Sequence, residues 1–193
     1  MKGWWVGLAV VLVAAGCGVP TQDSPVGIQP EALPSRLRET ALPGEVSPPT
    51  AGPGQVSVVV NFVRKDRLVR SAREVPNGSA QERLSAIVEA LAAGPTERER
   101  ASGISSALPA GLQLTVAALQ GNRAVIGLTG ETDGSAAENV LAVGQIVLSA
   151  TAIPTVKEVS FERDGLPVEA LLADGALTRN PLTAANYASL RAG

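Results

Sequence analysis

The reactive side chains of this 193-residue chain are few, because it contains a single cysteine, Cys17, and no histidine. A disulfide within the chain needs a second cysteine, and a zinc or iron–sulfur site needs several Cys or His ligands. The common serine and cysteine triads use a histidine as the base. The composition therefore excludes an intrachain disulfide, a Cys/His metal centre and a histidine-dependent nucleophile.

Two groups of polar residues could still act without histidine. Acid–base catalysis could use three neighbouring carboxylates, those of Glu131, Asp133 and Glu138. A Ser–Lys pair would have to join one of the serines at 105–106 to Lys65 or Lys157. Acidic residues are also favoured at helix starts, and the glycines and proline near the serines suit a connection between elements. We therefore expect no enzyme, and we name no catalytic, cofactor-binding or metal-binding residue.

Cys17 has a simpler explanation in its position near the N-terminus. Before it the chain has a basic residue, Lys2, an apolar stretch over 4–13 and three small residues at 14–16. The apolar stretch is shorter than the roughly 20 residues that cross a bilayer as a helix, and it suits a secretory signal. Ala-Ala-Gly-Cys resembles the bacterial lipobox, which implies that the cysteine is acylated, with palmitate among the attached chains, and becomes the mature N-terminus. We expect a lipoprotein signal peptide over 1–16 and lipidation at Cys17; the alternative is an ordinary signal peptide with Cys17 incidental.

Residues 17–54 are predicted to be a tether. Eight of the fourteen prolines lie between Gly18 and Gly54. This stretch cannot bury enough apolar surface to offset its ordering entropy, so we expect it to be disordered or locally extended. As a coil of about 37 residues it would span roughly 35 Å, and as a polyproline-like chain up to about 115 Å. That reach would hold a domain away from the membrane.

Residues 55–193 are long enough to form one hydrophobic core. Apolar alternation and β-branched residues predict strands over 56–63, 67–75, 112–119, 123–129 and 156–162, with a further short strand near Val168. Two helices are expected, each with a capping box, Ser79 with Glu82 and Ser135 with Glu138. The order β-β-α-β-β-α-β predicts an α+β fold, a two-layer sandwich with both helices on one face of a mixed or antiparallel sheet.

Charge and aromatic content limit the partners. Without Lys2 the chain has 15 basic and 18 acidic residues and no basic stripe with interleaved aromatics, so nucleic acid is not an expected partner. Both tryptophans lie in the predicted signal, which leaves one tyrosine and two phenylalanines, too few for sugar-stacking platforms. Thirteen of the sixteen basic residues are arginine, a bias typical of high-G+C genomes.

Four stretches of the chain resemble the GerMN domain, a module named for bacterial sporulation and spore-germination proteins. They are 84–95, 102–116, 123–131 and 141–165. The matching features are Gly94-Pro95, the Leu108-Pro109-Ala110-Gly111 turn, Gln145-Ile146-Val147, Pro154 and Asp164-Gly165. The resemblance covers about 56–170, and the tail over 180–190 is similar to the segment after this domain in actinobacterial lipoproteins. Gly127 stands where the family usually has an aspartate, so this chain lacks any polar role of that residue.

The resemblance implies a fold similar to ring-building motifs and a non-catalytic role in protein–protein interaction. We expect a lipoprotein on the outer face of the cytoplasmic membrane that contacts an envelope protein in sporulation, germination or envelope signalling, with self-association as a further option. The alternative is a lipoprotein that binds a small apolar ligand or a cell-wall fragment. The expected contact surfaces are exposed strand edges, the helix-free sheet face and the loop over 96–112.

Overall fold

The structure is a computed structural model that describes residue 52 and residues 54–131 and 134–192. Its regular elements are β1 (Gln55–Arg64), β2 (Arg67–Pro76), α2 (Ala80–Ala93), α3 (Glu97–Ala101), β3 (Gln113–Gln120), β4 (Arg123–Thr129), α4 (Ala136–Ala150), β5 (Glu158–Arg163), β6 (Leu166–Pro167), β7 (Ala170–Leu171), β8 (Leu177–Thr178) and the 3-10 helix η2 (Ala184–Leu190). Cys17, the predicted signal peptide and nearly all of the predicted tether lie outside the described residues.

Both predicted hairpins are confirmed. β1 and β2 pair antiparallel along their whole length, and the two turn residues between them, Lys65 and Asp66, have φ of 51° and 56°. Such left-handed turns match the twist of the strands they join. β3 and β4 pair antiparallel through a turn at Gly121, where φ is 62°. A third tight turn at Asp164 and Gly165, with φ of 52° and 74°, joins β5 to β6.

The described strands form three sheets. The largest has the order β3-β4-β5-β6, and it is mixed because β4 and β5 run parallel while the other neighbours are antiparallel. β1 and β2 form a separate two-stranded sheet, and β7 and β8 form another. The predicted α+β class, with two helices packed on a mixed sheet, is confirmed.

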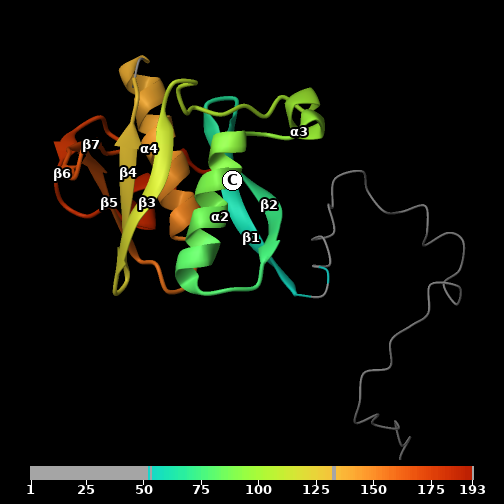
Figure 1. Ribbon diagram of the computed structural model, residues 1–193. Coiled ribbons are helices and arrows are strands. Elements are labelled where there is room, and N and C mark those ends of the chain that lie inside the picture. The colour runs from blue at the N-terminus through green and yellow to red at the C-terminus, as the bar shows by residue number, and fades with distance from the viewer. Residues whose placement is uncertain (1–51, 53, 132–133, 193) are drawn as a thin grey trace, which may run out of the picture. The chain divides into compact units, whose positions relative to one another are not determined.

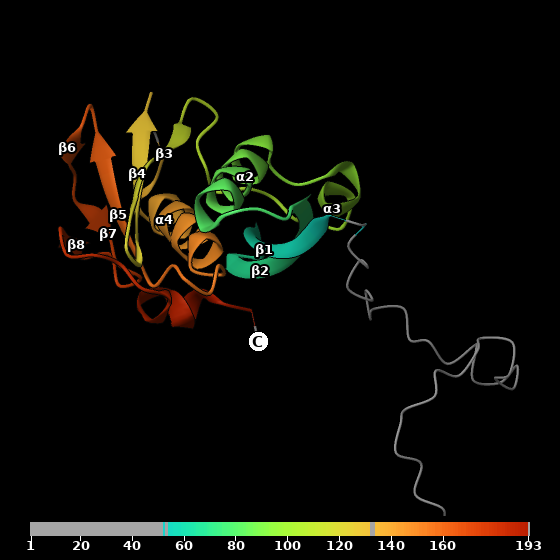
Figure 2. The same ribbon diagram turned by 60° about the horizontal axis from the view of Figure 1, so that its bottom comes forward.

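The structure differs in one detail from the expected two-layer sandwich. Helices α2 and α4 lie between the β1–β2 hairpin and the larger sheet and contact strands of both (Figures 1 and 2). The hairpin does not join the larger sheet, because backbone groups on the edge of β1 that faces away from β2 already make hydrogen bonds to other segments. The Asn61 amide donates to Ser149 Oγ of α4 at 2.8 Å, and Val63 exchanges two hydrogen bonds of 2.8 Å with Ser105.

The two long helices begin at the predicted capping boxes. The Ser79 amide donates to the Glu82 carboxylate at 2.7 Å, and the Glu82 amide donates to Ser79 Oγ at 3.2 Å. The predicted box at the start of α4 has the same two bonds. The structure corrects the expectation of a continuous loop over 96–112, because Thr96 and Glu99 form a third capping box that starts the short helix α3.

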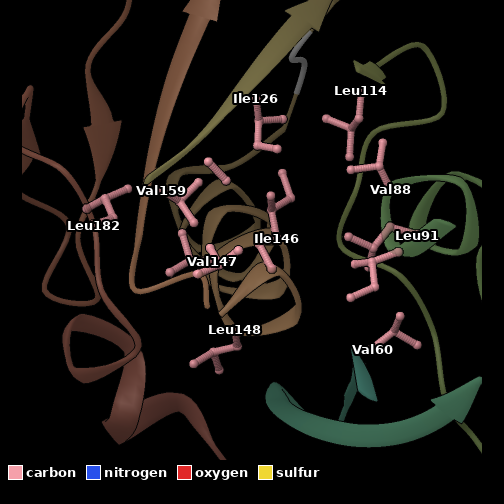
Figure 3. Packing of buried hydrophobic residues seen from close by; sticks show 14 of the residues in the cluster. Val60, Val88, Leu91, Leu114, Ile126, Ile146, Val147, Leu148, Val159 and Leu182 are labelled. Atoms are coloured by element: carbon pink, nitrogen blue, oxygen red, sulfur yellow. The ribbon is translucent and has the colours of Figure 1, made fainter. Parts of the chain in front are cut away.

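Helix α4 forms the centre of the hydrophobic core. Figure 3 shows Ile146 and Val147 of this helix between side chains of the larger sheet and side chains of the β1–β2 hairpin. Ile126 of the larger sheet lies on one side of them and Val60 of the hairpin on the other. All four side chains are at most 3% exposed. The larger sheet and the β1–β2 hairpin therefore share one core, and α4 lies between them and fills its centre.

The segment after β8 also belongs to this core. Leu182 exchanges two backbone hydrogen bonds of 2.8 Å with Val159 of β5. Tyr187 of η2 is fully buried, and its hydroxyl donates to the Leu171 carbonyl at 2.6 Å. The C-terminal segment thus closes one side of the core around α4.

An ion pair fixes α3 to the hairpin. The Arg73 guanidinium donates two hydrogen bonds to the Glu99 carboxylate, at 2.9 and 2.6 Å, and its central carbon lies 5.2 Å from the centre of the Phe62 ring. Both charged side chains are only 18% exposed. The bonds from Arg73 outweigh the opposing effect of burial and lower the pKa of Glu99 to about 2.

The domain should therefore lose stability in acid through Glu99. A carboxylate with a lowered pKa in the folded state stabilises the fold above its unfolded value of 4.5, and this contribution disappears as the pH falls toward 2. We expect Glu99→Gln to lower the free energy of unfolding by about 1–3 kcal/mol at pH 7 and much less near pH 2.5. Urea unfolding of both proteins at each pH measures the difference. An equal deficit at the two pH values would contradict the prediction.

Candidate functional site

The described residues contain an apolar pocket beside α4. Its volume is about 300 Å³, at the lower end of the range for small-ligand sites. Side chains of α4, of the larger sheet and of the segment through β7 and β8 line it, among them Leu128, Val143, Ile146, Phe161, Leu171 and Leu177. Leu177 is 62% exposed, and Leu166 on β6 is 69% exposed. The pocket thus has an exposed leucine at its rim.

Three polar residues also line this pocket, namely Asn139, Arg163 and Glu169. The Glu169 carboxylate pairs with Arg179 at 3.4 Å. Arg163 donates to the Gly130 carbonyl, and it makes no ion pair within residues 54–131 and 134–192. The described part of the pocket therefore places a positive charge beside an apolar surface.

A close approach of two backbone segments positions one wall of the pocket. Gly130 has a φ of 88°, and a Cβ atom there would lie 2.1 Å from the Gly111 carbonyl oxygen. Only glycine tolerates both the left-handed conformation and the short distance. This approach holds the 108–111 turn, which carries the lining residue Pro109, against the end of β4.

Gln145 fixes the same loop from α4. Its side chain is completely buried. The side-chain oxygen accepts from the Ala107 amide at 2.9 Å, and the side-chain nitrogen donates to Ser106 Oγ at 3.1 Å. An amide paired at both ends favours one loop geometry, because leaving a buried polar group unpaired is costly. Gln145, part of a motif noted in the sequence, therefore positions the loop next to the pocket.

Replacing Gln145 with leucine should destabilise the domain and loosen this loop. The nearly isosteric side chain leaves the Ala107 amide and the Ser106 hydroxyl without their partner, and we expect a loss of about 2–3 kcal/mol in unfolding free energy. Urea unfolding measures the loss, and hydrogen exchange of the Ala107 amide should become faster than in the parent. Gln120→Leu, at an exposed position, is the matched control. Unchanged exchange at Ala107 would contradict the assigned role.

Two of the polar residues selected in the sequence, Glu138 and Ser106, have structural roles. The Glu138 carboxylate accepts from the Ser135 amide and hydroxyl at 2.9 and 2.8 Å, and these bonds lower its pKa. Asp133 lies outside the described residues, so the predicted cluster is not tested as a whole. The Ser106 hydroxyl bonds to Gln145 and to the Leu108 amide.

The described part of the chain lacks two further features. It holds no group of three His, Cys, Asp or Glu side chains that could bind a metal ion. None of its helices is both long enough and apolar enough to cross a membrane.

The helix-free face of the larger sheet carries mainly small and polar side chains, with Val125 as an apolar residue on β4. Arg123 and Glu158 form an ion pair of 2.9 Å there. Gly127 lies opposite Thr115, and a Cβ atom at position 127 would lie 2.6 Å from Thr115 Oγ1. The large exposed apolar side chains of the described residues are Leu166 and Leu177 instead, on β6 and β8.

Sequence reasoning did not select Arg163, Leu171 or Leu177. β7 and β8 have two residues each, too few to show a periodic pattern. Part of this wall could have been located from the apolar residues at 166, 168, 170 and 172, an alternation that includes the lining residues Val168 and Ala170 but not Leu171. This alternation indicates an extended segment with one apolar side, but it does not indicate which surface that side meets.

The fold and the site define an α+β domain with an apolar pocket, one side of which is closed by the loop that contains the 108–111 turn. A family model, Germane, described as sporulation and spore germination, matches residues 49–169. The chain belongs to this family, which confirms the resemblance to GerMN domains. The comparison with curated proteins gives no match.

Several solved structures are similar to this chain at low sequence identity. The tandem GerMN domains of the sporulation protein GerM from Bacillus subtilis match with 19% identity and a TM-score of 0.46, over 61% of this chain and 43% of that one. The first GerMN domain of GerM matches with 16% identity and a TM-score of 0.46, over 58% and 86% of the two chains. A candidate lipoprotein from Clostridium perfringens matches with 15% identity and a TM-score of 0.46, over 72% and 94%. The matched region is thus less than half of the tandem structure.

Proposed function

We propose that this protein is a non-catalytic interaction module of the cell envelope, held at the outer face of the cytoplasmic membrane by acyl chains on Cys17. The observation that carries the proposal is the apolar pocket with exposed Leu177 at its rim. Binding energy between proteins concentrates in a few anchor side chains that fill such pockets inside a polar rim. A partner with an apolar side chain and a carboxylate next to it would match Leu177 and Arg163.

Other observations support parts of this proposal. The Germane family links the chain to sporulation and spore germination, processes of the bacterial envelope. The Ala-Ala-Gly-Cys sequence supports lipidation, and the eight prolines between Gly18 and Gly54 support a tether. The lack of histidine in the sequence and the capping role of Glu138 favour a role without catalysis.

The test is photo-crosslinking of the full chain in membranes of its source cell. A photoreactive phenylalanine replaces Leu177 at the pocket rim, and Gln120, an exposed residue at the end of β3, is the matched control position. We expect a protein adduct from position 177 that is absent from position 120. Adding Val143→Arg, which fills the pocket, should remove the adduct without unfolding the domain. Failure to form a pocket-dependent protein adduct would overturn the proposal.

A second candidate function, binding of a small apolar ligand, rests on the same cavity of about 300 Å³. Native mass spectrometry of the protein purified from its source should then show an added mass that the Val143→Arg variant lacks. Bound mass together with no protein adduct at position 177 would favour the ligand over the partner.

A further inference from the structure

The β1–β2 hairpin has one strand edge that the described residues leave open. β1 faces α4, so β2 lies on the side of the hairpin away from the larger sheet (Figures 1 and 2). Three alternate residues of β2, Arg70, Ala72 and Glu74, are exposed. None of them pairs with a further strand in the described part of the chain.

The pairing pattern shows where the backbone groups of these residues point. Opposed residues in an antiparallel pair exchange either two hydrogen bonds or none, in alternation. Val63 lies opposite Leu68, and this pair exchanges no hydrogen bonds, because both residues bond away from the hairpin. Val63 bonds to Ser105, and the Leu68 carbonyl accepts from the Ala192 amide at 2.9 Å. By alternation the amides and carbonyls of Arg70, Ala72 and Glu74 also point away from β1. This edge can therefore accept another strand.

The sequence of the edge is self-complementary. If a second copy of β2 approaches antiparallel with Ala72 opposite Ala72 of that copy, each Arg70 lies opposite a Glu74 at both ends of the contact. Opposite charges on facing residues stabilise strand pairs, and the small alanine suits a two-fold axis. Within the described residues neither Arg70 nor Glu74 makes an ion pair.

The length of the open edge fits this register. At one end of the open edge the Leu68 carbonyl already accepts from the Ala192 amide. At the other end β2 stops at Pro76, which has no amide hydrogen to donate. Pairing over 70–74 supplies about six backbone hydrogen bonds, two for each opposed pair. The Ala72 carbonyl now accepts from Arg73 Nη1 at 2.9 Å, a bond between neighbours that a partner amide would replace.

We propose that two copies of this protein associate through antiparallel pairing of their β2 edges, with Ala72 on the two-fold axis and Arg70 opposite Glu74 of the other copy. The contact is small, so the dimer should be weak in solution. Confining two tethered domains to one membrane would raise their effective concentration and favour it. The pocket of the proposed function takes no part in this contact.

A disulfide across the axis tests the register. In a full chain carrying Cys17→Ser, Ala72→Cys supplies the only thiol. Facing residues of a hydrogen-bonded pair have Cα atoms about 5.5 Å apart, within the range of a disulfide. Arg70→Cys on the same edge is the matched control, because its two copies would lie about 13 Å apart. Mild oxidation should give at least about tenfold more disulfide-linked dimer for Ala72→Cys than for Arg70→Cys. Equal yields would overturn the proposal.

Charge reversal in the Ala72→Cys background tests the ion pairs. Arg70→Glu or Glu74→Arg alone places like charges opposite each other at both ends of the contact. The yield of disulfide-linked dimer should then fall about tenfold. The double exchange, Arg70→Glu with Glu74→Arg, should restore it. Circular dichroism confirms that each variant is folded. A double exchange no better than either single change would overturn the charge-paired register. Pairing of two β2 edges needs no envelope partner, so these results do not depend on the adduct at position 177.

Discussion

Replacing Tyr187 with alanine is expected to lower the free energy of unfolding by about 3–5 kcal/mol. The tyrosine side chain is completely buried, and its hydroxyl donates to the Leu171 carbonyl at 2.6 Å. The ring packs where α4 has no side chain, since a Cβ atom at Gly144 would lie 3.0 Å from Tyr187 Cδ1. Alanine would leave a cavity between α4 and η2 and an unpaired carbonyl. Urea unfolding followed by circular dichroism measures the change.

Tyr187→Phe separates the ring from the hydroxyl. It keeps the packing against Gly144 and removes only the hydrogen bond, so we expect a loss of about 1 kcal/mol. Burial raises the pKa of the Tyr187 hydroxyl, which therefore stays protonated and donates throughout the usual pH range. A loss below about 1 kcal/mol in the alanine variant would show that η2 unfolds separately from the core.

The C-terminal segment extends the core beyond the family match. The Germane model ends at residue 169, yet Leu182 is 2% exposed and Tyr187 is fully buried. Both lie against elements inside the matched region, Leu182 on β5 and Tyr187 on α4. In this protein the folded unit is therefore larger than the matched segment, and the pocket wall formed by Leu171 and Leu177 belongs to the added part.

Elements with strong local signals could be predicted from the sequence. The two capping boxes fix the starts of α2 and α4, and Gly121 and Asp164-Gly165 supply left-handed residues for tight turns. These signals depend on residues within a few positions of each other, so a single sequence contains them. Helix α3 was missed despite its own box, because its five residues include no buried side chain.

The arrangement of the sheets could not be predicted, because it depends on contacts between distant segments. The Asn61 amide is bonded to Ser149, 88 residues later in the chain. No local pattern in the sequence marks a contact between two such distant residues. The apolar, β-branched composition of β1 would suit a strand of the larger sheet as well as a strand of a separate hairpin. The separation of the hairpin is thus a tertiary property of the fold.

The candidate site was predictable only in part. Gln145 and the 108–111 turn belong to motifs noted in the sequence, and both hold the loop beside the pocket. Arg163 and Leu177 come together only when β5 and β8 take their places in the fold. The wall of this candidate site that β7 and β8 form gives no periodic signal in the sequence, because each strand has only two residues.

The Cys17→Ser variant should lose membrane attachment by acyl chains. Each buried methylene contributes about 0.8 kcal/mol, so two or three chains hold a protein firmly on a bilayer, and their loss shifts the partition by several orders of magnitude. We expect the wild-type chain to incorporate labelled palmitate and the variant to incorporate none. Serine is close in size to cysteine but has no thiol for attachment. Labelling with subsequent membrane fractionation measures both effects.

The matched control moves the thiol along the predicted tether. In the Cys17→Ser background, Ser24→Cys returns a cysteine seven positions later, beyond the small residues at 14–16. If the Ala-Ala-Gly-Cys sequence directs the modification, this second variant also stays unlabelled. Palmitate incorporation that survives Cys17→Ser would overturn lipidation at Cys17. A wild-type chain without label would favour the ordinary signal peptide, and the domain would then act without a lipid anchor.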